Sequence, residues 1–276
     1  MKNYRIAIVG LGHIGGSICK AIKKNTKFLC YGIEKDKEVI EEALKKEFIE
    51  YELPVEELCN MDFVFVCLYP HDTIDFINQN HDNFGEDTIV IDCCGVKKEI
   101  VDKINTKGIN FVGGHPMAGG ENSGYKFSRT RLFRGAYFVL TPIDVSENVV
   151  LKVTNLVMAL GLRDITVTTP EKHDQVIAYT SQLAHAVSAA YILNDTFKDR
   201  TGFSAGSYAD LTRVAKLNSK MWTELFLCNK EPLVHEIDNF ISNLEQIKNA
   251  VSSGDDKELC RLLEESNQLK IEDLEQ

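Results

Sequence analysis

Two glycine-rich segments hold the residue types that most directly suggest chemistry, and the first is Gly10-Leu11-Gly12-His13-Ile14-Gly15. It follows an apolar run, Tyr4–Val9, and precedes a stretch with helical spacing of apolar residues. A strand, a glycine-rich turn and a helix in this order are typical of a dinucleotide-binding loop, where amides at the helix N-terminus meet the pyrophosphate. Gly10 is expected to form the tight turn, Gly12 to admit the phosphate, and Gly15 to let helix and strand pack closely. Expected cofactor contacts are Gly10, Gly12, His13, Ile14 and Gly15.

The second segment is Gly113-Gly114-His115-Pro116-Met117-Ala118-Gly119. Pro116 restricts His115 to extended backbone angles, and the glycines on either side allow a ligand to come close. A neutral histidine here can take the proton of a substrate hydroxyl while a bound cofactor takes the electrons. Considered alone, His115 is equally well explained as a structural loop histidine, so its role depends on the rest of the chain.

Two further segments are candidates for the cofactor site. Glu34 ends the second expected strand, where a carboxylate accepts hydrogen bonds from ribose hydroxyls and repels a 2′-phosphate, which favours NAD over NADP. Lys35 and Lys37 leave that choice open, because either can neutralise a phosphate. Leu68-Tyr69-Pro70 ends another buried strand, at the sheet edge where ligands bind in open α/β folds. The alternative for this segment is an ordinary proline turn.

The elements that must position these residues alternate along the first part of the chain. Short, nearly continuous apolar runs predict strands that are buried on both faces, and helical spacing separates them. This alternation predicts a doubly wound, mostly parallel sheet of the Rossmann type over residues 1–169, the dinucleotide-binding domain. The expected strands are Tyr4–Val9, Phe28–Ile33, Asp62–Leu68, Thr88–Asp92, Ile109–Val112, Ala136–Leu140 and Ile165–Thr168; the expected helices are Ile14–Lys24, Lys37–Lys46, Lys97–Ile104 and Glu147–Leu160.

The pattern changes near Thr169-Pro170, and from Glu171 onward almost no strand signal remains. Residues 170–276 are therefore predicted to form an all-helical domain for substrate binding and dimerisation. Long amphipathic helices in so small a domain need a partner surface, and a homodimer is the simplest source of one. The alternative is a compact bundle that packs only on the first domain. The expected helices are Gln175–Phe197, Tyr208–Leu217, Trp222–Leu227, Leu233–Val251 and Lys257–Leu269.

Composition limits the partners and the compartment. The chain has 276 residues, 44% of them hydrophobic, and a formal net charge of −10, which argues against a nucleic-acid partner because phosphate binding needs a basic face. The eight cysteines form no CxxC pair, as expected of reduced thiols in a cytoplasmic protein. Neither a signal peptide nor an apolar run long enough to span a membrane is apparent, so no membrane association is expected.

The His115 loop, together with Glu121 and Ser123-Gly124, resembles the signature of the prephenate/arogenate dehydrogenase family. Other segments resemble this family in the same order along the chain. They are Asp92 with Val96-Lys97, His173-Asp174, Ser181-Gln182-Leu183-Ala184-His185-Ala186, Asp210-Leu211-Thr212-Arg213-Val214-Ala215 and Met221-Trp222. Ordered agreement over this length is more specific than any single motif.

The resemblance implies an NAD-dependent dehydrogenase of tyrosine biosynthesis, which converts prephenate to 4-hydroxyphenylpyruvate by oxidative decarboxylation without a metal. It implies that His115 accepts the hydroxyl proton of this small-molecule substrate. It further implies that Arg213 binds a substrate carboxylate, which suits the forked guanidinium, and that Glu121 pairs with this arginine at the entrance. Ser181 and His185 share a helix face and are expected to line the substrate pocket; their alternative is a polar stripe between domains.

Several positions depart from the family pattern. Gly95 stands where many members have a serine that helps to hold the catalytic histidine, so a water or Cys94 is expected to replace it, and Gln182 stands where many have histidine. Arogenate differs from prephenate only in its side chain, so an arogenate dehydrogenase is one alternative. A dehydrogenase of the β-hydroxyacid type is another, although its catalytic lysine motif is not apparent here. A non-catalytic NAD-binding protein is the third.

Overall fold

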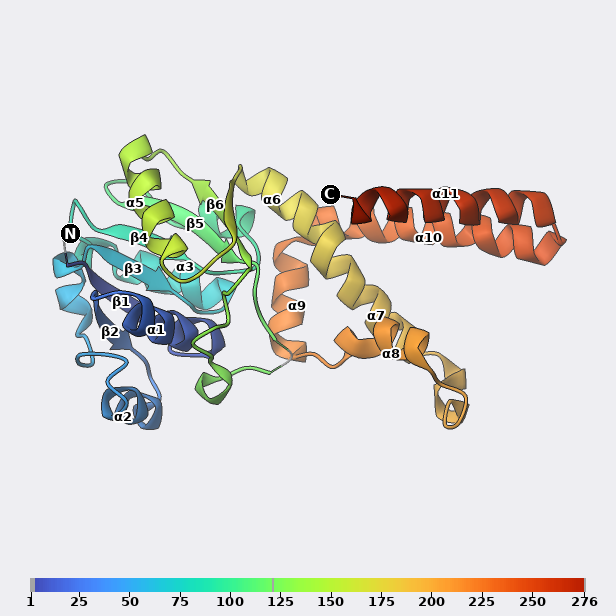
Figure 1. Cartoon of the computed structure of the whole chain (residues 1–276). Coiled ribbons are helices and arrows are strands. Elements are labelled where there is room, and N and C mark those ends of the chain that lie inside the picture. The colour runs from blue at the N-terminus through green and yellow to red at the C-terminus, as the bar shows by residue number, and fades with distance from the viewer. Residues whose placement is uncertain (1–2, 121, 276) are drawn as a thin grey trace. The chain divides into compact units, whose positions relative to one another are not determined.

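A seven-stranded sheet forms the core of the computed structural model, which describes residues 3–120 and 122–275 (Figure 1). The strand order is β2-β1-β3-β4-β5-β6-β7, and every neighbouring pair is parallel except β5 and β6. The predicted α/β class is thus confirmed, and all seven expected strands are present. Their bounds are β1 Arg5–Val9, β2 Leu29–Ile33, β3 Phe63–Val66, β4 Ile89–Asp92, β5 Asn110–Pro116, β6 Tyr137–Pro142 and β7 Asp164–Val167.

Two apolar clusters, one on each face of the sheet, hold this domain together. On β1, Ile6 and Ile8 belong to one cluster, and Ala7 and Val9 to the other, as the two-residue period of a strand requires. Side chains of α1 (His13–Asn25), α2 (Lys37–Lys45) and α5 (Glu147–Met158) complete the first cluster, and those of α3 (Pro70–Gln79) and α4 (Lys98–Lys103) complete the second. Helices therefore cover both faces, and the carboxyl ends of the strands remain available for ligands.

Two helices begin at prolines, and the sequence analysis missed or misplaced both starts. Pro70 occupies the first turn of α3, a helix that was predicted only as a turn after Leu68. Pro170 likewise opens α6 (Pro170–Ile177), five residues before the predicted start at Gln175, and Thr169 caps it by accepting a hydrogen bond from the Lys172 amide. Proline is favoured at this position because its missing N–H would lack an intrahelical acceptor there.

The helical segment after β7 is interrupted rather than uniform. A π-helical stretch, Ala178–Leu183, joins α6 to α7 (Ala184–Ile192), where the sequence predicts one helix over Gln175–Phe197. Gln182 is buried in this stretch, whereas the neighbouring Ser181 and His185 are half-buried. Short helices α8 (Gly206–Thr212) and α9 (Ser219–Cys228) follow.

The chain divides into two compact units, Met1–Lys230 and Glu231–Gln276. The second unit consists of the remainder of α10 (Lys230–Ser253) and of α11 (Asp256–Leu274), joined at Gly254, whose φ of 68° is in the left-handed region. Asp255 caps α11 by accepting a hydrogen bond from the Glu258 amide. Within the described residues, no helix combines the length and apolar character needed to cross a bilayer.

Candidate functional site

The glycine-rich turn between β1 and α1 has the geometry of a phosphate cradle. Gly10 has a φ of 84°, and a Cβ there would lie 2.7 Å from the Leu68 Cδ2 atom. A Cβ on Gly15 would lie 2.0 Å from the Gly10 carbonyl oxygen, so only glycine allows α1 to pack this closely. A Cβ on Gly12, by contrast, would meet no atom within 4 Å. The open side of the turn therefore faces free space at the start of α1, where unpaired amides favour an anion.

Glu34 lies beside this turn and is held by it. Its carboxylate accepts hydrogen bonds from the Leu11 amide at 2.8 Å and from the Asp36 amide at 3.1 Å. These two bonds fix the carboxylate where β2 ends, next to the cradle. The polar groups of the site, open helix amides that can donate and an oriented carboxylate that can accept, fit a dinucleotide with a free ribose diol.

The loop that follows His115 reaches the start of α1. His13 Nδ1 lies 2.9 Å from the Asn122 carbonyl oxygen, and a Cβ on Gly120 would lie 3.0 Å from the His13 ring. His13 Nε2 is buried and has no hydrogen-bond partner among the described residues. A polar ligand group at the cradle would satisfy this atom, which is a second indication that the site fits a phosphate-bearing cofactor. Glu121 lies outside the described residues.

A buried ion pair holds the backbone just before His115. Lys97 and Asp92 are 1% and 0% exposed, and the Lys97 ammonium pairs with the Asp92 carboxylate. Lys97 Nζ also donates to the Gly114 carbonyl at 2.7 Å, and Asp92 Oδ1 accepts from the Gly114 amide at 3.2 Å. Both polar groups of the Gly114 peptide backbone are thus bound by one ion pair, which fixes the part of β5 that carries His115.

The two glycines before His115 are required by packing. A Cβ on Gly113 would lie 2.1 Å from the Thr141 Oγ1 atom on β6, and a Cβ on Gly114 would lie 2.6 Å from the Asp92 carbonyl oxygen. Real Cβ atoms do not approach other heavy atoms so closely, so any larger residue would displace β5 from its neighbours. The glycine pair therefore sets the position of His115 between β4 and β6.

His115 is the first member of a chain of hydrogen-bonded groups. Its Nδ1 lies 2.9 Å from His173 Nε2, and His173 Nδ1 lies 2.7 Å from Asp174 Oδ1. The carboxylate of Asp174 also accepts the backbone amides of Lys97 and Lys98, each at 2.8 Å. Because an ionised carboxylate can only accept, His173 carries its proton on Nδ1, and its Nε2 then accepts from His115 Nδ1. This assignment leaves His115 Nε2 as a free proton acceptor.

The surroundings of both histidines favour their neutral forms. Burial lowers the pKa of His115 well below its ordinary value, and the charges of His173 and Lys97 lower it further. Burial also lowers the pKa of His173, although the hydrogen bond to Asp174 opposes that shift. A neutral His115 is the form that can accept a proton.

Gly95 lies on the accepting side of His115. A Cβ there would lie 3.9 Å from His115 Nε2 and 3.4 Å from the Leu225 Cδ2 atom of α9. The thiol of Cys94, which the sequence offered as a substitute for the family serine, instead bonds to the Leu68 carbonyl at 3.3 Å and lies 3.3 Å from the Thr73 hydroxyl. His173 provides the hydrogen bond that orients His115, and it does so on the opposite ring nitrogen.

The predicted substrate residues gather on the helical segment. His185 Nδ1 lies 2.9 Å from the Ser181 carbonyl oxygen, and the His185 ring stacks on Trp222 at a centroid separation of 3.7 Å. Burial lowers the pKa of His185, and the positive charge of Arg213 adds to this effect. At Ser181 the group that contacts His185 is the backbone carbonyl, not the side-chain hydroxyl.

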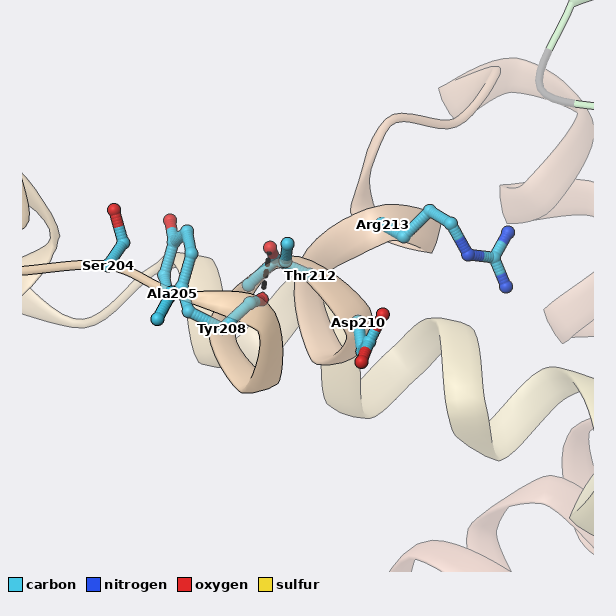
Figure 2. A pocket seen from close by; sticks show the side chains of 7 residues that line it. Ser204, Ala205, Tyr208, Asp210, Thr212 and Arg213 are labelled. Carbon is cyan, nitrogen blue, oxygen red and sulfur yellow. Dashed lines mark hydrogen bonds between the residues drawn. The ribbon is translucent and has the colours of Figure 1, made fainter.

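Arg213 also lines an open cavity of about 680 Å³ with residues of α8 and the loop before it. Figure 2 shows its guanidinium extended away from Tyr208 and Ser204, at one end of the group. Its other lining residues are Ser204, Ala205, Tyr208, Ala209, Asp210 and Thr212.

Gln182 has a separate role: its amide donates to the Leu225 carbonyl at 3.0 Å and accepts from Asn229 at 2.7 Å, which ties α9 to the π-helical stretch.

The sequence predicts a role for His115 but assigns none to the groups that the structure places behind it. His173 and Asp174 were noted only as a segment that resembles the family, and the pairing of Lys97 with Asp92 was not anticipated. The available signal was limited: Asp92 ends an apolar strand, whereas Asp174 lies in a mostly polar stretch, Pro170–Ile177, which gives no sign of its burial. Such groups require partners when buried, but their pairing depends on contacts across the fold.

A dinucleotide cradle, an oriented acidic residue and a neutral histidine base on one sheet edge define a nucleotide-dependent dehydrogenase. The chain belongs to the prephenate dehydrogenase family: the family's nucleotide-binding domain matches residues 18–166, and its dimerization domain matches residues 169–265.

Individual relatives agree with this assignment over nearly the whole chain. The prephenate dehydrogenase of Lactococcus lactis is 30% identical over 96% of this chain and 76% of its own length. Aquifex aeolicus prephenate dehydrogenase, solved with hydroxyphenyl propionate and NAD+, superposes with a TM-score of 0.88 at 27% identity and 99% coverage of both chains. Synechocystis arogenate dehydrogenase gives a TM-score of 0.85 at 25% identity, covering 97% of this chain and 99% of that one.

Proposed function

We propose that the protein is an NAD-dependent prephenate dehydrogenase, which oxidises and decarboxylates prephenate to 4-hydroxyphenylpyruvate. The observation that carries this proposal is the chain Asp174–His173–His115, which leaves one unprotonated nitrogen, His115 Nε2, beside the open position at Gly95. Family membership supports the reaction class, and the NAD+ bound in the Aquifex aeolicus relative supports the cofactor.

The proposed reaction requires from the protein one base and a fixed arrangement of the substrate and the cofactor. When bound, NAD+ supplies the acceptor for the two electrons and the hydrogen that leave the substrate carbinol carbon. His115 Nε2 accepts the hydroxyl proton, which promotes formation of the ketone. Loss of CO₂ then produces an aromatic ring, so the overall step is strongly downhill. As the proton arrives on Nε2, His173 stabilises the new positive charge by accepting from Nδ1, and Asp174 holds His173 in the required tautomer.

For the substrate, we propose contacts from the helical segment. Arg213 is the cationic group that would bind a carboxylate of the dianionic substrate, and Glu121 would pair with it at the entrance. His185, held by its bond to the Ser181 carbonyl and stacked on Trp222, would present its remaining nitrogen to the substrate. Its lowered pKa keeps that ring neutral beside Arg213.

For the cofactor, we propose that Gly10, Gly12, His13, Ile14 and Gly15 surround the pyrophosphate and that Glu34 binds the adenosine ribose. Of the segment Leu68-Tyr69-Pro70, Leu68 packs on Gly10, and Tyr69 accepts a hydrogen bond from Asn218 at 3.3 Å. This segment would therefore border the nicotinamide end of the site. The two hydrogen bonds that fix Glu34 support NAD rather than NADP, because a 2′-phosphate would meet a carboxylate that is held in place.

We also propose a cytoplasmic homodimer that forms through the helical domain, residues 170–276. The second compact unit exposes several large apolar side chains, among them Leu244, Val251, Leu263 and Leu269, each more than half exposed. Burial of such side chains against a second copy is favourable at about 25 cal/mol per Å². The family's dimerization domain covers most of this region.

The deciding experiment is NADH formation by the purified protein with NAD+ and either prephenate or arogenate. We expect turnover of prephenate and, for His115→Asn, a loss of roughly 10²–10⁴-fold in kcat with NAD+ affinity unchanged. Turnover of arogenate alone would replace the proposed substrate, an alternative that the likeness to the Synechocystis arogenate dehydrogenase supports. Binding of NAD+ without turnover of either substrate would refute the proposed reaction.

A further inference from the structure

A cluster of metal-ligand side chains that the predicted site does not include lies where three helices of the first unit meet. His71 on α3, Glu99 on α4 and Cys228 at the end of α9 place their ligand atoms within 4.8 Å of one another. None of these residues takes part in the proposed reaction. We propose that they form a zinc site that joins α9 to the nucleotide-binding part of the chain.

The distances suit a tetrahedral ion. His71 Nε2 lies 3.7 Å from the Cys228 Sγ atom. Zinc binds imidazole nitrogen at about 2.0 Å and thiolate sulfur at about 2.3 Å, so two such ligands on a tetrahedral ion are about 3.5 Å apart. A small side-chain adjustment therefore accommodates the ion between them. One nitrogen, one sulfur and one carboxylate oxygen favour zinc over the hard cations Mg²⁺ and Ca²⁺, which prefer oxygen alone.

A second carboxylate orients the histidine for this task. Glu224, also on α9, accepts the backbone amide of His71 at 2.6 Å and lies 3.5 Å from His71 Nδ1. Metal-bound histidines commonly donate their other ring N–H to a carboxylate, which fixes the tautomer and ring orientation. Here that arrangement directs Nε2 to Cys228, so the cluster has an outer partner as well as its three ligands.

Zinc binding would break one interaction that the proposed ligands now make, the ion pair of Glu99 with Lys103. Lys103 pairs with Glu99 at 2.5 Å, and its ammonium must move away before Glu99 can bind a cation. Zinc binds the thiolate of a cysteine, so the Cys228 thiol would release its proton to the solvent when the ion binds. Because Lys103 is half exposed, its release into solvent is unobstructed.

Bound zinc would restrain α9, the helix that carries Trp222 and Leu225. The residue after Cys228, Asn229, donates to the Asp174 carbonyl at 2.9 Å, so the cluster borders the segment that orients His115. The ion is a clamp rather than a catalyst: it would fix the end of α9 against α3 and α4. Binding to the folded state alone would raise the melting temperature with zinc concentration.

The test uses the untagged full-length protein, since an affinity tag can itself bind zinc. After equilibration with Zn²⁺ and removal of free ion, we expect one zinc per chain by elemental analysis. With Co²⁺ in its place, we expect a cobalt–thiolate charge-transfer band. Cys228→Ser should remove the band and most of the zinc, whereas Cys260→Ser, which removes an exposed thiol on α11, should change neither.

Two further variants distinguish this site from adventitious binding. Lys103→Gln frees Glu99 and should tighten zinc binding, and Glu224→Gln removes the outer carboxylate and should weaken it by about 10–100-fold. Because His71 is exposed, His71→Gln tests the ligand without disturbing the fold. Zinc binding that is absent in the wild type, or that is equal in the wild type, Cys228→Ser and His71→Gln, would overturn the proposal, and neither outcome depends on the proposed reaction.

Discussion

The rings of His115 and His173 meet edge to face, with Nδ1 of the first 2.9 Å from Nε2 of the second. Only one proton fits between two such nitrogens, so their tautomers are coupled. Asp174 resolves the choice because its carboxylate accepts from the far side of His173. The acidic residue therefore determines, through a second ring, which nitrogen of His115 is free to act as a base.

Replacement of His173 is expected to show this dependence. In His173→Leu the acceptor for His115 Nδ1–H is lost, so a fraction of His115 adopts the other tautomer or a different ring orientation. We expect kcat to fall by roughly 10–100-fold, as for outer partners of functional histidines. His173→Gln keeps an oxygen acceptor and should recover part of this loss. Steady-state NADH formation measures both.

A merely structural role of His173 would give a different pattern. In that case both variants would lose thermal stability and activity together, and the pH profile of the remaining activity would not move. If His173→Gln and His173→Leu have the same kcat and the same acid limb as the wild type, the coupling between the two rings has no catalytic consequence.

The acid limb of the pH profile of kcat/KM is expected to lie below the ordinary pKa of histidine. The pKa of His115 is lowered, so its Nε2 stays unprotonated at pH values where an ordinary histidine would be charged. Activity should persist below the ordinary pKa of about 6.5 and disappear as pH falls through the lowered pKa. A pH–rate profile on the free enzyme checks this; an acid limb at or above the ordinary value would contradict the neutral environment described for His115.

Folding stability should show a related pH dependence. His115, His173 and His185 all have pKa values below that of an unfolded-state histidine. Above about pH 6.5 these rings are neutral in both states and add no pH dependence. As pH falls below that value, the unfolded chain takes up protons first, so the free energy of unfolding should decrease until the folded-state rings titrate. Urea denaturation at several pH values measures this slope, which should be smaller in His185→Gln.

Gly95→Ser tests the opening beside His115. A serine Cβ would be in ordinary contact with Leu225, and its hydroxyl would come within reach of His115 Nε2. We expect the variant to fold normally and to keep kcat within about tenfold, since a hydroxyl can donate to the base without blocking it. Gly95→Val, which fills the same space without a hydroxyl, should abolish turnover. Similar activities for the two variants would show that the substrate does not occupy this side of the ring.

Arg213→Gln tests the substrate clamp. Loss of one charged, forked contact to a carboxylate should raise KM for prephenate by about 10–100-fold with a smaller change in kcat. The pKa of His185 should also rise in this variant, because the positive charge that helps to lower it is removed. Arg213→Lys restores the charge but not the fork and should recover only part of the affinity. An unaltered KM in Arg213→Gln would remove Arg213 from the substrate site.

Most of the fold was accessible from sequence because buried parallel strands appear as continuous apolar runs. All seven strands were predicted. The helix α3 was missed because Tyr69-Pro70 has the composition of a turn, and only the folded structure shows that Pro70 begins a helix. The interruption of the helix over Ala178–Leu183 was equally invisible, since a widened turn keeps ordinary helix-forming residues. The predicted domain boundary at residues 169 and 170 stays a prediction.

The site was accessible only in part, for a different physical reason. His115 and the glycine turn appear as local patterns, so residue types and spacing were enough to propose them, and their roles stay predictions. The partners of His115 come from α6 and from the turn after β4, and only the packed fold brings Asp174 to the amides of Lys97 and Lys98. The roles of Ser181, Glu121 and Arg213 toward a substrate likewise stay predictions.

The glycine pair before His115 has a consequence for any survey of all single substitutions. Gly113 and Gly114 touch no ligand in the proposed mechanism, yet alanine at either position would force β5 away from Thr141 or Asp92. A mutational scan scored on growth without tyrosine would therefore mark both as intolerant, as if they were active-site residues. Expression level would separate the two causes: His115 variants should accumulate normally, whereas Gly113 and Gly114 variants should be depleted from the soluble fraction.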